Sequence, residues 1–186
     1  MESFQIPLES QRRLINLARR ALESFVSGLE HLVECVDDPY LLLSDHGAFV
    51  SLHKNDQLRG CIGTCFPTRP LYQTVIEMTK AAASRDHRVP PVRQSELIHV
   101  LIGVSVLSPL QLVRDPSLLE PGKHGLYVVS GNKRAALLPQ VATQYHWDMK
   151  TFLSQVCLKA DLCENAWESP ETQISSFTAL IIEEER

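Results

Sequence analysis

Two short apolar runs joined by a polar tetrapeptide constrain the fold of this chain more than any other feature. Residues 48–53 and 58–64 both read as strands, and Lys54-Asn55-Asp56-Gln57 lies between them. Asn and Asp tolerate the positive φ that a tight hairpin turn requires. The sequence therefore predicts an antiparallel hairpin with Asn55-Asp56 as its two-residue turn.

The predicted turn also sets the pairing of the two strands. A two-residue turn places Phe49 opposite Ile62 and Val50 opposite Cys61. The hexapeptide Leu58–Gly63 is then held against a neighbouring strand and is not exposed in a loop.

Predicted helices and further strands are interspersed along the rest of the chain. Apolar stripes at helical spacing predict a helix from Ser10 to about Ser27 and a second one capped by Thr68. Residues Leu97–Leu107 read as one long central strand with Ile98 on its buried face, and residues 172–182 return as a final strand. Interspersed elements with at least two hairpins indicate an α+β fold, with a largely antiparallel sheet and flanking helices.

Size and composition limit the possible domain organisation and the possible partners. The 186 residues are 44% hydrophobic and 22% charged, which is enough for one domain over residues 1–186 or for two tightly joined lobes packed as one unit. Any division between lobes would fall near residues 112–122, where Pro and Gly mark an irregular connection. The formal net charge of −4 argues against a general polyanion binder.

The cysteines and the apolar runs indicate a cytoplasmic protein. Five cysteines, an odd and sparse set, do not form a disulfide framework, and we expect reduced thiols. Their spacing matches no paired zinc knuckle, so no structural metal site is expected. No apolar run approaches the ~20 residues that span a membrane, and the start of the chain does not read as a secretory signal.

The hexapeptide Leu58-Arg59-Gly60-Cys61-Ile62-Gly63 carries the candidate chemistry. Alternation along a strand places Arg59 and Cys61 on one face, roughly 6.6–6.8 Å apart, and Leu58 and Ile62 on the other. Gly60 and Gly63 leave room for a ligand or another backbone. Cys61 is either a small packing residue, the commoner role, or a thiolate nucleophile beside a cation.

The hexapeptide lies in a locally positive stretch. Residues 57–93 hold six basic side chains against two acidic ones, and Arg59 is either a fork for a carboxylate or phosphate or a surface ion-pair partner. We count Arg85 among the ligand-binding candidates. Gln140, near a predicted helix start, either faces a ligand or caps the helix, and His124 is either an acid-base group or a partner for a backbone group.

The residues also resemble a known family. Ordered blocks in this chain are similar to those of the AMMECR domain family, known in prokaryotes as protein A of the AmmeMemoRadiSam system. The blocks are the hexapeptide, Gly47-Ala48-Phe49-Val50, Arg69-Pro70-Leu71, Ala81-Ala82-Ala83 with Arg85-Asp86, Pro90-Pro91, Val104–Pro109, His124-Gly125-Leu126 and Leu137–Ala142. Val89 and Arg134-Ala135-Ala136 depart from the family pattern, and neither departure touches the hexapeptide.

The resemblance implies a two-lobed α+β fold with a cleft between the lobes. It also implies a cytosolic protein that works with a Memo-type protein, similar to extradiol dioxygenases, and with a radical SAM protein. It supplies no established activity, cofactor or substrate.

Three functions follow as hypotheses. The preferred one is an accessory or ligand-binding protein whose cleft around Arg59–Gly63 holds an anionic small molecule or a nucleic-acid element. The second is a cysteine-dependent enzyme with Cys61 as nucleophile, Arg59 holding a substrate anion and His124 as acid-base group. The third is a protein-interaction module without a ligand.

Overall fold

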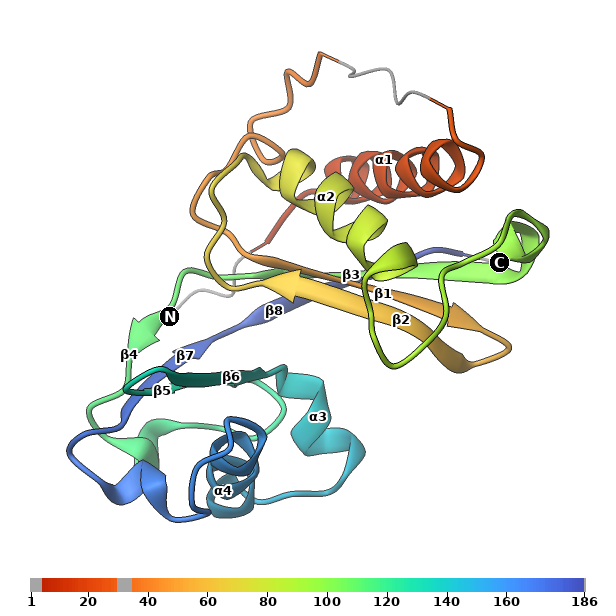
Figure 1. The fold of residues 1–186 in the computed structure, drawn as a ribbon. Coiled ribbons are helices and arrows are strands. Elements are labelled where there is room, and N and C mark those ends of the chain that lie inside the picture. The colour runs from red at the N-terminus through yellow and green to blue at the C-terminus, as the bar shows by residue number, and fades with distance from the viewer. Residues whose placement is uncertain (1–4, 30–34, 186) are drawn as a thin grey trace. The chain divides into compact units, whose positions relative to one another are not determined.

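The chain divides into two compact units, each with its own antiparallel sheet. The computed structural model describes residues 5–29 and 35–185 (Figure 1). We name residues 5–107 with 180–185 the motif unit, because it contains the hexapeptide, and residues 108–179 the companion unit. The chain passes between the units after Leu107 and after Ala179. That the two units act as one domain stays a prediction.

The motif unit is a four-stranded sheet with two helices on one face. Its strands lie in the order β2-β1-β3-β8, and helices α1 and α2 both lie on the same face (Figure 1). The side chains of Ala48, Val50 and Leu52 are fully buried under these helices. Its elements are α1 (Leu8–Val26), β1 (Ala48–Lys54), β2 (Gln57–Thr64), α2 (Leu71–Ser84), the 3-10 helix η1 (Gln94–His99), β3 (Val100–Leu107) and β8 (Ala179–Glu183).

The predicted hairpin is present, but the predicted register is wrong by one residue. Asn55 and Asp56 both have positive φ, as the two-residue turn requires. Strand β2 then carries a bulge, because Leu52 pairs with Gly60 and His53 with Leu58, which leaves Arg59 as an extra residue.

The extra residue shifts every later pair of the hairpin. Val50 lies opposite Ile62 and Ser51 opposite Cys61. Because the bulge also interrupts the alternation, Leu58 and Ile62 lie on opposite faces of the sheet, contrary to the predicted alternation.

Three predicted boundaries are also corrected. Residues 94–99 form a 3-10 helix before β3, so Ile98 is 86% exposed and does not lie on a buried strand face. Helix α1 begins at Leu8, after Pro7, and Ser10 is buried inside it and does not cap it. The run predicted as one strand over residues 172–182 is two strands, which belong to different sheets.

The companion unit packs one long helix against its own sheet. The strand order is β4-β7-β5-β6, and α4 buries Phe152 and Val156 against Leu126 and Val128. Asp148 caps α4, because its carboxylate accepts the amide of Thr151 at 2.8 Å. The elements are β4 (Gln111–Leu112), η2 (Pro116–Leu118), β5 (Gly125–Ser130), β6 (Lys133–Leu137), α3 (Pro139–Gln144), α4 (Met149–Lys159), η3 (Ala166–Glu168) and β7 (Gln173–Phe177).

The α+β class is confirmed. Helices accompany two antiparallel sheets, and the predicted central strand 97–107 contributes β3, which lies between β1 and β8. Among the described helices, none is long and apolar enough to cross a membrane.

Candidate functional site

The hexapeptide lies on an edge strand, and one loop covers part of that edge. Strand β2 pairs with β1 on one side only, so the outward backbone groups of β2 need other partners. The loop over residues 85–93, which follows α2, supplies them at Cys61. Its first half contacts Cys61 and its second half contacts Arg59.

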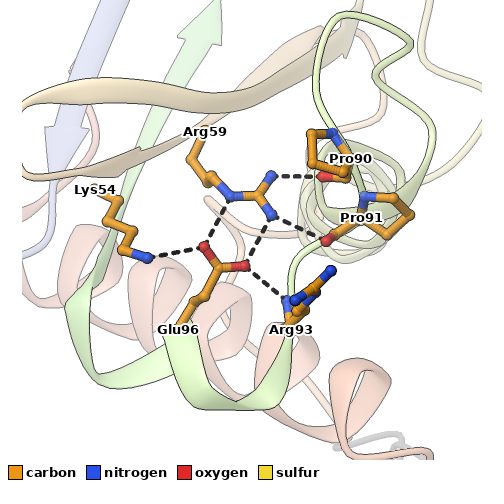
Figure 2. Close-up of polar contacts among 6 residues, drawn as sticks. All are labelled: Lys54, Arg59, Pro90, Pro91, Arg93 and Glu96. Carbon is orange, nitrogen blue, oxygen red and sulfur yellow. Dashed lines mark hydrogen bonds and ion pairs between the residues drawn. The ribbon is translucent and has the colours of Figure 1, made fainter.

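Arg59 is held in a cluster of polar contacts (Figure 2). Its Nε and Nη2 donate to the two carboxylate oxygens of Glu96, at 3.1 and 2.8 Å. Nη1 and Nη2 also donate to the carbonyls of Pro90 and Pro91, at 2.6 and 2.9 Å. These are four hydrogen bonds from a group with five N–H donors, and the side chain is only 13% exposed. The guanidinium is thus largely committed to protein acceptors.

Glu96 is the centre of this cluster. It also accepts the amide of Arg93 at 3.0 Å, and Lys54 Nζ lies 3.0 Å from its carboxylate. The hydrogen bonds from Arg59 and then from the Arg93 amide hold the pKa of Glu96 far below its usual range, although burial opposes them. Glu96 is therefore ionised at neutral pH.

A second carboxylate fixes the backbone at Cys61. The side chain of Asp86 is 2% exposed, and its Oδ2 accepts the Cys61 amide at 2.8 Å. Its oxygens also accept Nε and Nη2 of Arg88 at 2.9 and 2.6 Å. The hydrogen bonds from Arg88 hold the pKa of Asp86 far below its usual range.

Arg88 is a cation that contacts Cys61. Its Nη2 lies 3.4 Å from the Cys61 carbonyl, so Asp86 and Arg88 together occupy both outward backbone groups of that residue. Hydrogen bonds to Asp86 raise the pKa of Arg88, with a smaller contribution from the charge of a Cys61 thiolate. The Arg88 side chain is 53% exposed.

Sequence reasoning counted Arg88 in the positive stretch but did not place it at the site. A signal was present, because Asp86 is an acidic residue among basic ones in Arg85-Asp86-His87-Arg88. A buried carboxylate needs a charged or hydrogen-bonding partner nearby, and the arginine two residues on is in reach.

Both glycines of the hexapeptide have a packing reason. A Cβ on Gly60 would lie 2.2 Å from the carbonyl oxygen of Ala82 in α2. A Cβ on Gly63 would lie 2.2 Å from the ring of Phe49. Close packing alone therefore accounts for glycine at both positions, and a ligand contact there stays a prediction.

The remaining candidates fall in both units. Arg85 is exposed directly after α2, and its amide donates to the carbonyl of Ala81. Gln140 is half-buried in the first turn of α3, and His124 is half-buried just before β5, so both belong to the companion unit. Their predicted roles toward the hexapeptide stay predictions.

His124 has a defined local role. Its Nδ1 accepts the amide of Glu120 at 2.9 Å, which leaves the proton of the neutral ring on Nε2. Burial, and then the charge of Lys123, lower the pKa of His124. The neutral imidazole is therefore favoured near neutral pH.

These observations define an α+β protein with two antiparallel sheets and an edge-strand hexapeptide, which two carboxylate–arginine pairs connect to the 85–93 loop and to η1. The AMMECR1 family model matches residues 15–182. The chain belongs to this family, as the resemblance of its motifs predicted.

Relatives match over the whole chain. A protein of Methanothermobacter thermautotrophicus is 39% identical and is covered over 100% of both chains. Protein TK0174 of Thermococcus kodakarensis is 39% identical over 98% of this chain and 94% of its own. The crystal structure of the uncharacterized protein PH0010 from Pyrococcus horikoshii is similar with a TM-score of 0.91 and 35% identity, over 98% of this chain and 95% of that one. These names state no substrate or reaction.

Proposed function

We propose that the protein binds an anionic small molecule beside Cys61, with Arg88 as the main contact. The observation that carries this proposal is the guanidinium of Arg88, which Asp86 holds in place while half of the side chain stays exposed. No described residue accepts a hydrogen bond from its Nη1. A fixed guanidinium with open donors suits a carboxylate or phosphate.

In this proposal Arg59 positions the site. Its hydrogen bonds to Glu96, Pro90 and Pro91 hold the 85–93 loop against β2. That loop carries Arg88, so Arg59 acts on the ligand through the loop. Arg85, exposed on the same loop, adds positive charge nearby.

A small molecule is favoured over a nucleic acid as the ligand. Nucleic-acid affinity needs several cations that follow a phosphate backbone. Here Asp86 and Glu96 offset part of the local positive charge, and the whole chain carries a formal charge of −4. One organised guanidinium matches one anionic group.

Thermal stabilisation by anions tests the proposal. We expect pyrophosphate or citrate, at constant ionic strength, to raise the melting temperature of the wild type in a saturable way. Binding to the folded state contributes about 2.7 kcal/mol at a ligand concentration of 100 Kd. The variant Arg88→Ala should lose most of this shift, and Arg85→Ala should lose part of it.

Arg12→Ala is the matched control, because Arg12 is an exposed arginine in the same unit. It should keep the full shift. An equal shift in Arg88→Ala and wild type would contradict the proposal, and so would the absence of any shift with either anion. Stronger stabilisation by a single-stranded oligonucleotide would favour the nucleic-acid hypothesis instead.

We further propose an accessory role in the cytoplasm, next to a Memo-type protein and a radical SAM protein. Support comes from the family to which the chain belongs, because the resemblance of its motifs to that family implies such neighbours. Co-expression of the three proteins should give a complex that purifies with this chain. Retention of that complex by Arg88→Ala would separate partner binding from ligand binding.

The second candidate is a cysteine-dependent activity. Its specific support is the attraction between the Arg88 guanidinium and a Cys61 thiolate, since a nearby cation favours the nucleophilic form of a thiol. Iodoacetamide at pH 7 should then alkylate Cys61 faster than the exposed Cys35 and Cys163. An inert Cys61 in the folded protein would exclude this candidate.

A further inference from the structure

The sheet edge opposite the hexapeptide borders an open groove. Strand β8 ends the sheet on that side, and helix α1 runs along it. Between them lies a groove of about 440 Å³, with walls from Leu8–Asn16 of α1 and from residues 181–185. The whole groove belongs to the motif unit.

The backbone of β8 presents unused groups to this groove. The Glu184 amide donates to the carbonyl of Ile102 in β3, and successive residues of a strand point their backbone groups to opposite sides. Ile181 and Glu183 therefore point their N–H and C=O groups away from β3. Among the loop and turn hydrogen bonds of the described residues, none uses either amide. An edge of this kind is a template for another strand.

The walls of the groove are held in place before any partner binds. Arg19 of α1 donates Nε to Glu184 at 2.7 Å and pairs its Nη2 with the second carboxylate oxygen. The same guanidinium reaches the carbonyls of Leu97 and Val100. A preformed groove lowers the ordering cost of binding.

The side chains around the edge differ between its two faces. Toward α1 the groove is mixed: Ile15 and Ile182 are buried and Leu8 is 62% exposed, and polar side chains of α1, Arg12 among them, lie beside these apolar ones. On the other face of β8, Glu183 and Glu185 are exposed. Opposite charges attract across neighbouring strands, so this face favours basic side chains.

We infer that this groove docks an extended segment of a partner protein with alternating apolar and basic residues, as an added strand on β8. The apolar side chains enter the groove toward α1, and the basic ones lie beside Glu183 and Glu185. Arg12 on the α1 wall repels basic residues in the reverse register. Backbone hydrogen bonds supply affinity and the alternation supplies specificity, as in other cases of strand addition.

A short synthetic peptide tests the inference. The probe is acetyl-(Lys-Val)3-amide, and the control is acetyl-(Glu-Val)3-amide, which has the same alternation and the opposite charge. We expect the first peptide to slow hydrogen exchange at the Ile181 and Glu183 amides about tenfold, at roughly ten times its Kd. The control peptide should have no such effect.

Two substitutions on β8 test the inference in a protein that still folds. Ile181→Pro removes only an outward donor, and proline is tolerated on an edge strand, so it should abolish peptide binding while Ile181→Val retains it. Glu183→Lys should reverse the preference, so that the Glu-Val peptide binds more tightly than the Lys-Val peptide. Equal protection by both peptides, or no protection in the wild type, would overturn the inference. Both outcomes are independent of anion binding at Arg88.

Discussion

At the scale of single residues, two carboxylate–arginine pairs serve the hexapeptide in different ways. Glu96 and Arg59 are both mostly hidden, and the pair uses nearly all the donors of the arginine. Asp86 is hidden, but its partner Arg88 is half exposed. In the first pair the guanidinium of Arg59 is mostly buried, and in the second pair the guanidinium of Arg88 is held facing solvent. This difference is the basis for assigning ligand contact to Arg88.

Removal of the Glu96 charge should destabilise the protein. The variant Glu96→Gln leaves the mostly buried Arg59 with a neutral amide in place of its only carboxylate among the described contacts, beside the Pro90 and Pro91 carbonyls, and leaves the Arg93 amide with a weaker acceptor. Breaking a fully buried pair costs about 3–5 kcal/mol. Both side chains keep some exposure, so we expect a loss of about 1–3 kcal/mol in the free energy of unfolding, measured by urea denaturation.

Glu77→Gln is the control, because Glu77 is exposed on α2 in the same unit. Its effect should stay within about 0.5 kcal/mol. A Glu96→Gln variant as stable as the control would mean that solvent already screens the Arg59 pair.

At the scale of elements, the hairpin has one feature that local sequence determines and one that tertiary contacts determine. Asn and Asp tolerate the positive φ of a tight turn, and the turn lies at Asn55-Asp56, where we predicted it. The bulge at Arg59 has no such local signal. It coincides with the contacts of Arg59 to Glu96 and Pro90, which lie far along the chain and are not visible to a strand pattern.

Other boundary errors have the same origin. Residues 97–99 read as the start of the predicted strand 97–107, but Glu96 turns inward to Arg59 and the Arg93 amide, which favours a 3-10 turn. The run 172–182 is apolar enough for one strand, yet its two halves pair with different sheets. Periodicity identifies a strand and not its partner.

Close packing of β2 on α2 predicts a large effect of a small substitution. In Gly60→Ala the new methyl group would lie 2.2 Å from the Ala82 carbonyl oxygen, so strand and helix must separate. We expect a loss of about 1–3 kcal/mol in the free energy of unfolding, as for other overpacked sites. The measurement is urea denaturation.

Gly103→Ala is the matched control in the same sheet. Its methyl group would meet only the Ser51 hydroxyl oxygen, at 2.8 Å, and a side-chain end can rotate away. The cost should stay below about 1 kcal/mol. Equal costs at the two positions would show that backbone proximity to α2 is not the cause.

At the scale of the whole molecule, the sequence predicts the class of fold well and the site only in part. Interspersed helices and hairpins indicated α+β, and both sheets are antiparallel. The hexapeptide was recognised as important, yet the role of Arg88 was missed. That role depends on Asp86 becoming buried against an edge strand, and burial of a polar residue is a property of the folded chain.

The two carboxylates also predict how the stability of the molecule depends on pH. In the folded state the pKa values of Asp86 and Glu96 lie below their ordinary values of 3.8 and 4.5. Between the folded and unfolded pKa values the unfolded chain binds more protons, so acid favours unfolding. The contribution of each pair is complete above about pH 5 and decreases as pH falls through this window.

The dependence can be assigned to one residue by comparing wild type with Glu96→Gln over pH 6 to 2.5. The wild type should be more stable by a constant amount above pH 5, measured by urea denaturation. Below about pH 4.5 the difference should narrow, because Glu96 must stay ionised against a rising proton concentration and glutamine does not titrate. A difference that stays constant to pH 2.5 would mean that Glu96 stabilises the fold through its shape and not through its charge.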